Sequence, residues 1–90
     1  MGTRTGKPNT ALAGCLEELG WSPKVLARKL NRVFGAGTAA ESAPYHWRDA
    51  GALPRSPLPA MAAYVLSQEL GRVISVAELW QARAADSPML

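Results

Sequence analysis

Apolar residues recur at three- and four-residue steps in several stretches of the chain, and this spacing predicts amphipathic helices. The stripe expected in residues 10–19 consists of Leu12, Cys15, Leu16 and Leu19. In residues 23–34 the positions expected to face inward are Leu26, Leu30, Val33 and Phe34. A helix reaching residue 70 has the stripe Met61, Ala62, Val65, Leu66 and Leu70. In a last short helix, expected to fade by Ala85, Val76, Leu79 and Trp80 face the core.

Polar residues, glycines and prolines mark where these helices begin and end. Asn9 or Thr10 can cap the first helix, and Ser22 followed by Pro23 starts the second. The fourth begins near residues 57–59, and the sequence Ser-Val-Ala-Glu at 75–78 is a capping box for the last. Residues 35–41 contain two glycines and no apolar period, so we expect a connector there. Residues 73–74 could form a brief extended stretch.

Residues 42–50 form the most unusual predicted helix, because they carry Tyr, His, Trp, Arg and Asp but little aliphatic surface. Ser42 is expected as N-cap, Pro44 fits the first turn, and Gly51 suits a left-handed closing position. Trp47 is the expected anchor to the core. Such a helix, with Tyr45 and Arg48 outward, has the planar donors that a DNA major-groove reader needs. It could equally be a surface helix whose polar side chains only cover the core.

These elements predict an all-α fold, a compact bundle of about five short helices in which helices two and three form a helix-turn-helix. Ninety residues with 48% hydrophobic content and three tryptophans suit one globular domain. We expect residues 1–9 to be a flexible arm, residues 10–85 the domain and residues 86–90 a frayed tail. The arm is expected to be solvated, although its Arg4 and Lys7 could contact phosphate.

Ten Lys and Arg against seven Asp and Glu give a formal charge of +3, which permits binding to a polyanion without establishing it. Cys15 is the one cysteine, so no internal disulfide can form, and its place on an apolar stripe favours a buried thiol over a reactive one. His46, the one histidine, cannot build a structural zinc site with a single cysteine. We expect no enzyme activity, catalytic residue, metal, cofactor or small-molecule substrate. No apolar run reaches membrane-spanning length, so we expect no membrane association and a cytoplasmic, nucleoid-associated protein.

The order of these elements resembles the phage-repressor/Cro-like (XRE) helix-turn-helix family, in particular its small actinobacterial members. The resemblance covers residues 10–80 and depends on three segments. They are Gly-Trp-Ser-Pro-Lys-Val-Leu-Ala at 20–27, Tyr-His-Trp-Arg-Asp-Ala-Gly at 45–51 followed by Leu-Pro-Arg at 53–55, and Met-Ala-Ala-Tyr-Val-Leu at 61–66 with Leu79-Trp80. The connector 35–41 is several residues longer than the turn usual in that family, which leaves the angle between helices two and three open.

In that family the third helix enters the major groove and the start of the second touches phosphate. The resemblance, together with the outward polar face of residues 42–50, gives these candidates for contact with bases: Ala43, Pro44, Tyr45 and Arg48. Candidates for the DNA backbone come from the same resemblance, from the basic ridge of helix two and from the Pro-rich segment 52–59: Ser22, Lys24, Arg28, Arg32, Arg55 and Ser56. The ridge could also be an ordinary solvated face.

Two functions follow as hypotheses. The first is a sequence-specific double-stranded-DNA-binding transcriptional regulator with helix 42–50 in the major groove. The second is a protein-interaction adaptor that keeps the fold and uses its aromatic residues as anchors. A homodimer formed through the C-terminal helix, with Leu79 and Trp80 as the surface to examine, would raise DNA affinity, although burial in the core is the other interpretation of these two residues.

Overall fold

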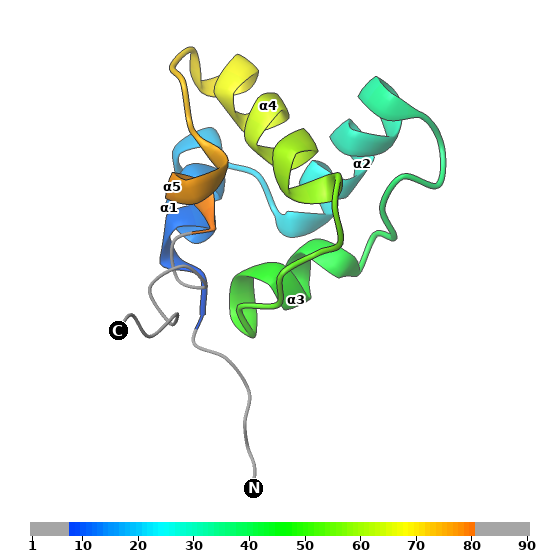
Figure 1. The fold of residues 1–90 in the computed structure, drawn as a ribbon, viewed down its shortest axis with the longest axis horizontal. Helices are drawn as coiled ribbons and strands as arrows, with labels where there is room; N and C mark the ends of the chain where they lie inside the picture. The colour runs from blue at the N-terminus through cyan, green and yellow to red at the C-terminus, as the bar shows by residue number, and fades with distance from the viewer. Residues whose placement is uncertain (1–7, 81–90) are drawn as a thin grey trace, which may run out of the picture.

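Residues 8–80 are described by the computed structural model, and they form five α-helices with no strand among them. The helices are α1 (Thr10–Leu19), α2 (Pro23–Phe34), α3 (Ala43–Asp49), α4 (Leu58–Leu70) and α5 (Val76–Leu79) (Figure 1). The predicted all-α bundle of short helices is therefore confirmed. The expected extension of the last helix to Ala85 and the expected tail 86–90 lie outside the described residues, as do residues 1–7 of the expected arm.

The helix starts follow from local chemistry. The Asn9 side chain accepts a hydrogen bond from Leu12 N–H (2.9 Å) and caps α1. At α5 the predicted capping box is present, with the Ser75 hydroxyl accepting from Glu78 N–H at 3.0 Å. Ser22 and Ser42 precede α2 and α3 as predicted, but within residues 8–80 neither makes a side-chain cap hydrogen bond. The prolines in the first turns of these two helices fix the backbone there instead.

The hydrophobic core lies where α4 packs against α1, α2 and α5, and α3 closes one end of it by packing on α1 and α2 (Figure 1). Its fully buried large side chains include Leu12, Leu16, Leu26, Leu30, Leu66 and Leu79. Trp80 lies beside them and donates its indole N–H to the Pro59 carbonyl at 3.1 Å. This bond ties the start of α4 to the end of α5.

Three side chains predicted to face the core are exposed. Val33 and Phe34 at the end of α2 are 50% and 38% exposed, and Val76 is 43% exposed. The chain turns back after α2, and Ala39 from the connector is buried in the core cluster. Phe34 packs edge-on against Tyr64, with ring centroids 6.1 Å apart, and Tyr64 is itself 53% exposed. An apolar surface around these two rings is the result.

The expected extended stretch at residues 73–74 is not a strand. Ile74 is buried, and its N–H donates to the Ser67 hydroxyl at 2.8 Å. That hydroxyl in turn donates to the Ala63 carbonyl at 2.7 Å. A side chain of α4 thus satisfies the backbone N–H of Ile74, which in a sheet would bond to a neighbouring strand.

Candidate nucleic-acid interface

The short helix α3 separates an anchoring face from an exposed one. Pro44 is fully buried and Trp47 is 4% exposed, and their three-residue spacing places them on the same side of the helix. Trp47 packs edge-on against Trp80, with centroids 5.8 Å apart. The predicted anchoring by Trp47 is confirmed. Since α3 has seven residues, this packing is needed to hold it, because an isolated helix of that length is marginal in water.

The other faces of α3 carry the polar side chains. Tyr45 is 38% exposed, and His46 is exposed beside it. Arg48 has a third of its side chain accessible. The helix ends at Asp49, and two residues later Gly51 has a φ of 68°, the left-handed conformation predicted for it; Ala52 N–H donates back to the His46 carbonyl at 3.2 Å.

Two of the residues proposed for base contact do not lie on the exposed face. Pro44 was expected to be accessible but is fully buried, because the first turn of α3 faces the core, and its ring cannot reach a base edge. Ala43 is half-buried and packs against the core cluster. Tyr45 and Arg48 are the members of the predicted set that remain accessible.

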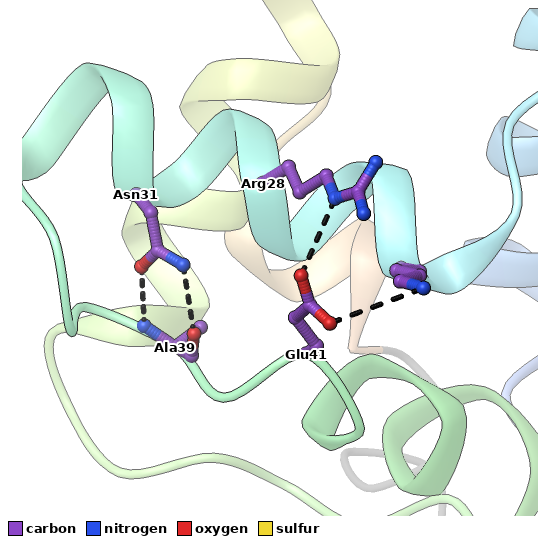
Figure 2. Close-up of polar contacts among 5 residues, drawn as sticks. Arg28, Asn31, Ala39 and Glu41 are labelled. Carbon is purple, nitrogen blue, oxygen red and sulfur yellow. Dashed lines mark hydrogen bonds and ion pairs between the residues drawn. The ribbon is translucent and has the colours of Figure 1, made fainter.

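The long connector before α3 is fixed to α2 by two sets of polar contacts (Figure 2). The Asn31 amide donates to the Ala39 carbonyl (3.0 Å), and its oxygen accepts from the Ala39 N–H (2.8 Å). Two residues further on, Glu41 accepts from Arg28 Nε at 3.3 Å (Figure 2) and lies 4.0 Å from Lys24 Nζ. The extra length of the connector is thus ordered against α2 immediately before α3 begins.

The backbone N–H of Asn9 fixes the opposite end of α3. Asn9, 2% exposed, donates its backbone N–H to the Arg48 carbonyl at 2.8 Å. Its side-chain amide also donates to the Leu79 carbonyl at 3.0 Å. Asn9 was predicted as the last residue of a flexible arm and as a possible cap of α1. The cap is confirmed, whereas the flexible arm is wrong at this residue, because Asn9 is buried and links α1, α3 and α5.

Arg48 is held by two neighbours on α3. Its Nε donates to Asp49 Oδ1 at 2.7 Å and its Nη2 to Oδ2 at 3.3 Å, while its guanidinium carbon lies 5.7 Å from the centre of the Tyr45 ring. The hydrogen bonds from Arg48 lower the pKa of Asp49, and the same bonds raise the pKa of Arg48. Both groups are therefore ionised near neutral pH, and the pair is a fixed dipole on the surface of α3.

The candidates for the DNA backbone fall into two groups. Lys24 and Arg28 share Glu41 as partner, so the structure places them beside the segment that enters α3, with their charge partly neutralised. Arg32, Arg55, Ser22 and Ser56 are exposed, and their side chains make no hydrogen bond or ion pair within residues 8–80.

Glu41 and Asp49 are the residues of this surface that sequence reasoning missed. Their proximity to basic residues depends on tertiary packing and on rotamer choice.

An open hollow of about 400 Å³ lies beside Arg48, between α1 and α3. It is lined by Ala13, Leu16, Glu17, Trp21 and Arg48. Glu17 therefore lies on the same side of the molecule as Arg48 and forms no ion pair with it in the described part of the chain. It adds negative charge near the exposed end of α3.

Further predictions concern a dimer surface, the Cys15 thiol, metal binding and a membrane span. Leu79 and Trp80 are buried in the core, so the surface where a dimer was to be sought is occupied within the domain itself. Cys15 is 7% exposed. Within residues 8–80 no three His, Cys, Asp or Glu side chains are grouped so that they could hold a metal ion. In the same range no helix has both the length and the apolarity to span a bilayer.

A family model described as the SP15 N-terminal domain matches residues 12–80, which take in α2 to α5 and most of α1. No curated protein and no solved structure matches the chain.

Proposed function

For this chain, which belongs to the SP15 N-terminal domain family, we propose a role as a sequence-specific double-stranded-DNA-binding transcriptional regulator. In this proposal α2 and α3 act as a helix-turn-helix in the cytoplasm, as the resemblance to the XRE family implies, and α3 lies in the major groove. The observation that carries the proposal is the division of α3. Its buried face holds the helix, while Tyr45 and Arg48 remain accessible on the outside.

The basic residues of α2 support the same assignment. Lys24 and Arg28 lie four residues apart on one helix and reach the same carboxylate, directly before α3. A helix in the major groove brings the start of the preceding helix to the phosphates in this kind of fold. Lys24 and Arg28 would therefore set the register of the protein on the duplex, and Arg48 would contribute to the choice of sequence.

Glu41 makes a specific electrostatic prediction for this arrangement. Its carboxylate competes with phosphate for Lys24 and Arg28, so Glu41→Gln should tighten binding to random duplex and steepen its salt dependence. Glu69→Gln is the matched control, because it makes the same charge change beside Lys29 on another part of the surface. Equal gains for the two variants would show that net charge alone is responsible and would count against an interface at Lys24 and Arg28.

The test of the proposal is fluorescence anisotropy with a random duplex, followed by selection of bound duplexes from a random pool. We expect a nonspecific Kd of about 10⁻⁴–10⁻⁶ M at physiological salt. Arg48→Ala should flatten the sequence preference, whereas Lys24→Ala should weaken all sequences alike and lower the salt slope by about one. Equal losses for both variants on selected and random duplexes would contradict this division of roles.

A monomer with so few phosphate contacts should bind with modest affinity, and we propose that dimerisation on a two-fold site would raise it. Leu79 and Trp80 cannot supply that contact without leaving the core. Sedimentation over a concentration series, with and without DNA, measures the association. A strict monomer under both conditions removes the dimer from the proposal.

A protein-interaction module is the second candidate function. The exposed Phe34–Tyr64 pair favours it, because aromatic side chains contribute heavily to protein interfaces. The same anisotropy titration separates the two candidates. Absence of binding at low salt with tens of micromolar protein would favour the interaction module, since a groove reader retains affinity for any duplex.

A further inference from the structure

The guanidinium of Arg48 has one side occupied and one side free. A guanidinium carries five N–H donors in a planar fork. Asp49 accepts from Nε and from one hydrogen of Nη2, which together make one side of that fork. No other side chain in residues 8–80 accepts from Arg48. The hydrogens of Nη1 and the second hydrogen of Nη2 are therefore left pointing away from Asp49 along the end of the fork.

The position of that free end is restricted by two contacts. The carboxylate of Asp49 binds bidentately, which fixes the plane of the guanidinium, and the Tyr45 ring lies 5.7 Å from its central carbon. An arginine already ordered loses less side-chain freedom when it binds a ligand than a free one does. The geometry thus prepares Arg48 to donate two parallel hydrogen bonds to one acceptor pair.

We infer that Asp49 is a positioning residue that turns Arg48 end-on toward a guanine in the major groove, an inference that rests on the DNA-binding function proposed above. Guanine presents two acceptors there, O6 and N7, whereas adenine presents one acceptor beside a donor. Two parallel N–H groups therefore match guanine and mismatch adenine.

A phosphate is the other acceptor pair that a guanidinium fork can bind. Asp49 disfavours it, because a full negative charge already bound to Arg48 repels a second one and neutralises the attraction that would bring it in. A base edge carries only partial charges, so the Asp49 carboxylate weakens the binding of Arg48 to a base much less than its binding to a phosphate. Arg48 with Asp49 has no net charge and is consequently suited to a base, while Lys24 and Arg28 share the single carboxylate of Glu41, keep a net positive charge and are better suited to phosphate.

The experiment uses the whole chain and a duplex selected from a random pool, in which the guanine whose preference disappears in Arg48→Ala has been identified. That guanine is replaced by 7-deazaguanine, which lacks the N7 acceptor. The wild-type chain should lose about tenfold or more in affinity, since a hydrogen bond from a charged donor is removed. Arg48→Ala should bind both duplexes equally.

Asp49→Asn tests the positioning role. It removes the charge but keeps the shape of the side chain. A well-held bidentate contact gives a preference for guanine over adenine of about 5–150-fold, and Asp49→Asn should reduce that preference by at least about threefold. Its binding to random duplex should stay equal or become tighter, because a negative charge is lost. A merely structural role would weaken both. Glu17→Gln is the matched control: it removes the same charge from a residue that lines the hollow beside Arg48 without pairing with it, and it should leave the guanine preference unchanged.

The outcomes are distinct. An unchanged guanine preference in Asp49→Asn overturns the positioning role, and a wild-type chain insensitive to 7-deazaguanine shows that Arg48 binds phosphate or another base. Absence of binding to any duplex defeats the proposed function itself, and this inference with it. A guanine preference that falls in Asp49→Asn and persists in Glu17→Gln, with random binding retained in both, supports it.

Discussion

The amide of Asn31 is predicted to be the main contact that fixes the connector before α3, and replacing it should weaken the fold measurably. Asn31→Ala removes two hydrogen bonds to Ala39, at 3.0 and 2.8 Å, in a part-buried position. At about 0.5–1.5 kcal/mol each, their loss costs about 1–3 kcal/mol. Alanine is the better helix former by about 0.6 kcal/mol, which offsets part of that cost. The free energy of unfolding should therefore fall by about 0.5–2.5 kcal/mol.

Asn31→Asp separates this explanation from a general effect of substitution. Aspartate keeps an acceptor for the Ala39 N–H but places a second acceptor opposite the Ala39 carbonyl, where the amide now donates. Two acceptors facing one another cannot bond, so the loss should be at least as large as for Asn31→Ala. Arg32→Ala is the control, since the neighbouring Arg32 is exposed and its side chain makes no hydrogen bond or ion pair in residues 8–80. It should stay within about 0.5 kcal/mol of the wild type.

The measurement is urea unfolding followed by far-ultraviolet circular dichroism, with the midpoint and the slope both fitted. A lower midpoint at an unchanged slope indicates lost stability without a change in the unfolded state. If both Asn31 variants unfold within the range of Arg32→Ala, the connector is not fixed by this amide. The placement of α3 relative to α2 would then need another cause.

Three further predictions concern the core and its surroundings. Trp47→Ala should cost about 3–5 kcal/mol in the same unfolding assay, because a buried indole packed on Trp80 is removed, and a loss below about 1 kcal/mol would contradict the anchoring role. The hydrogen bond from Arg72 holds the pKa of Glu18 below its usual value, so Glu18→Gln should lower the melting temperature near pH 7, and this difference should vanish as the pH falls through the depressed pKa. A difference that does not shrink as the pH falls below the usual pKa of a glutamate would refute that account. Burial raises the pKa of the Cys15 thiol, so an aromatic disulfide reagent should modify it much more slowly in the native protein than in urea, and equal rates would show an accessible thiol.

The helices could be predicted from sequence because their signals are local. A capping box at 75–78 and a proline after Ser22 act within one turn, and the structure begins helices at both places. The burial of Trp47 was also predictable, since a helix with little aliphatic surface has few other anchors. In each case the residues that decide the outcome are neighbours in the chain.

The contacts that arrange the candidate interface could not be predicted in this way. Asn9 bonds to Leu79, 70 residues away, and a sequence pattern does not state such a partner. Helical periodicity predicted that Val33 and Phe34 face the core, but both are exposed, because the periodicity does not state how far along a helix its inner face is covered. The ion pair of Glu41 with Arg28 depends on the path of the connector. That path could not be predicted, because the connector is longer than the turn usual in the family that the chain resembles.

The residues that hold α3 differ from those that it exposes. Pro44 and Trp47 pack its inner face, the backbone N–H of Asn9 bonds to the Arg48 carbonyl near its C-terminal end, and the side-chain amide of Asn31 fixes the connector before it. Pro44, Trp47 and Asn9 are buried, and Asn31 is part-buried on α2, so none of the four lies on the outer face of α3. The exposed positions can therefore change with little effect on stability, since surface substitutions away from such contacts usually cost less than about 0.5 kcal/mol. In a seven-residue helix fixed in this manner, the exposed residues can change and alter the binding specificity while the fold stays the same. This is the physical basis for seeking the function of this chain on the outer face of α3.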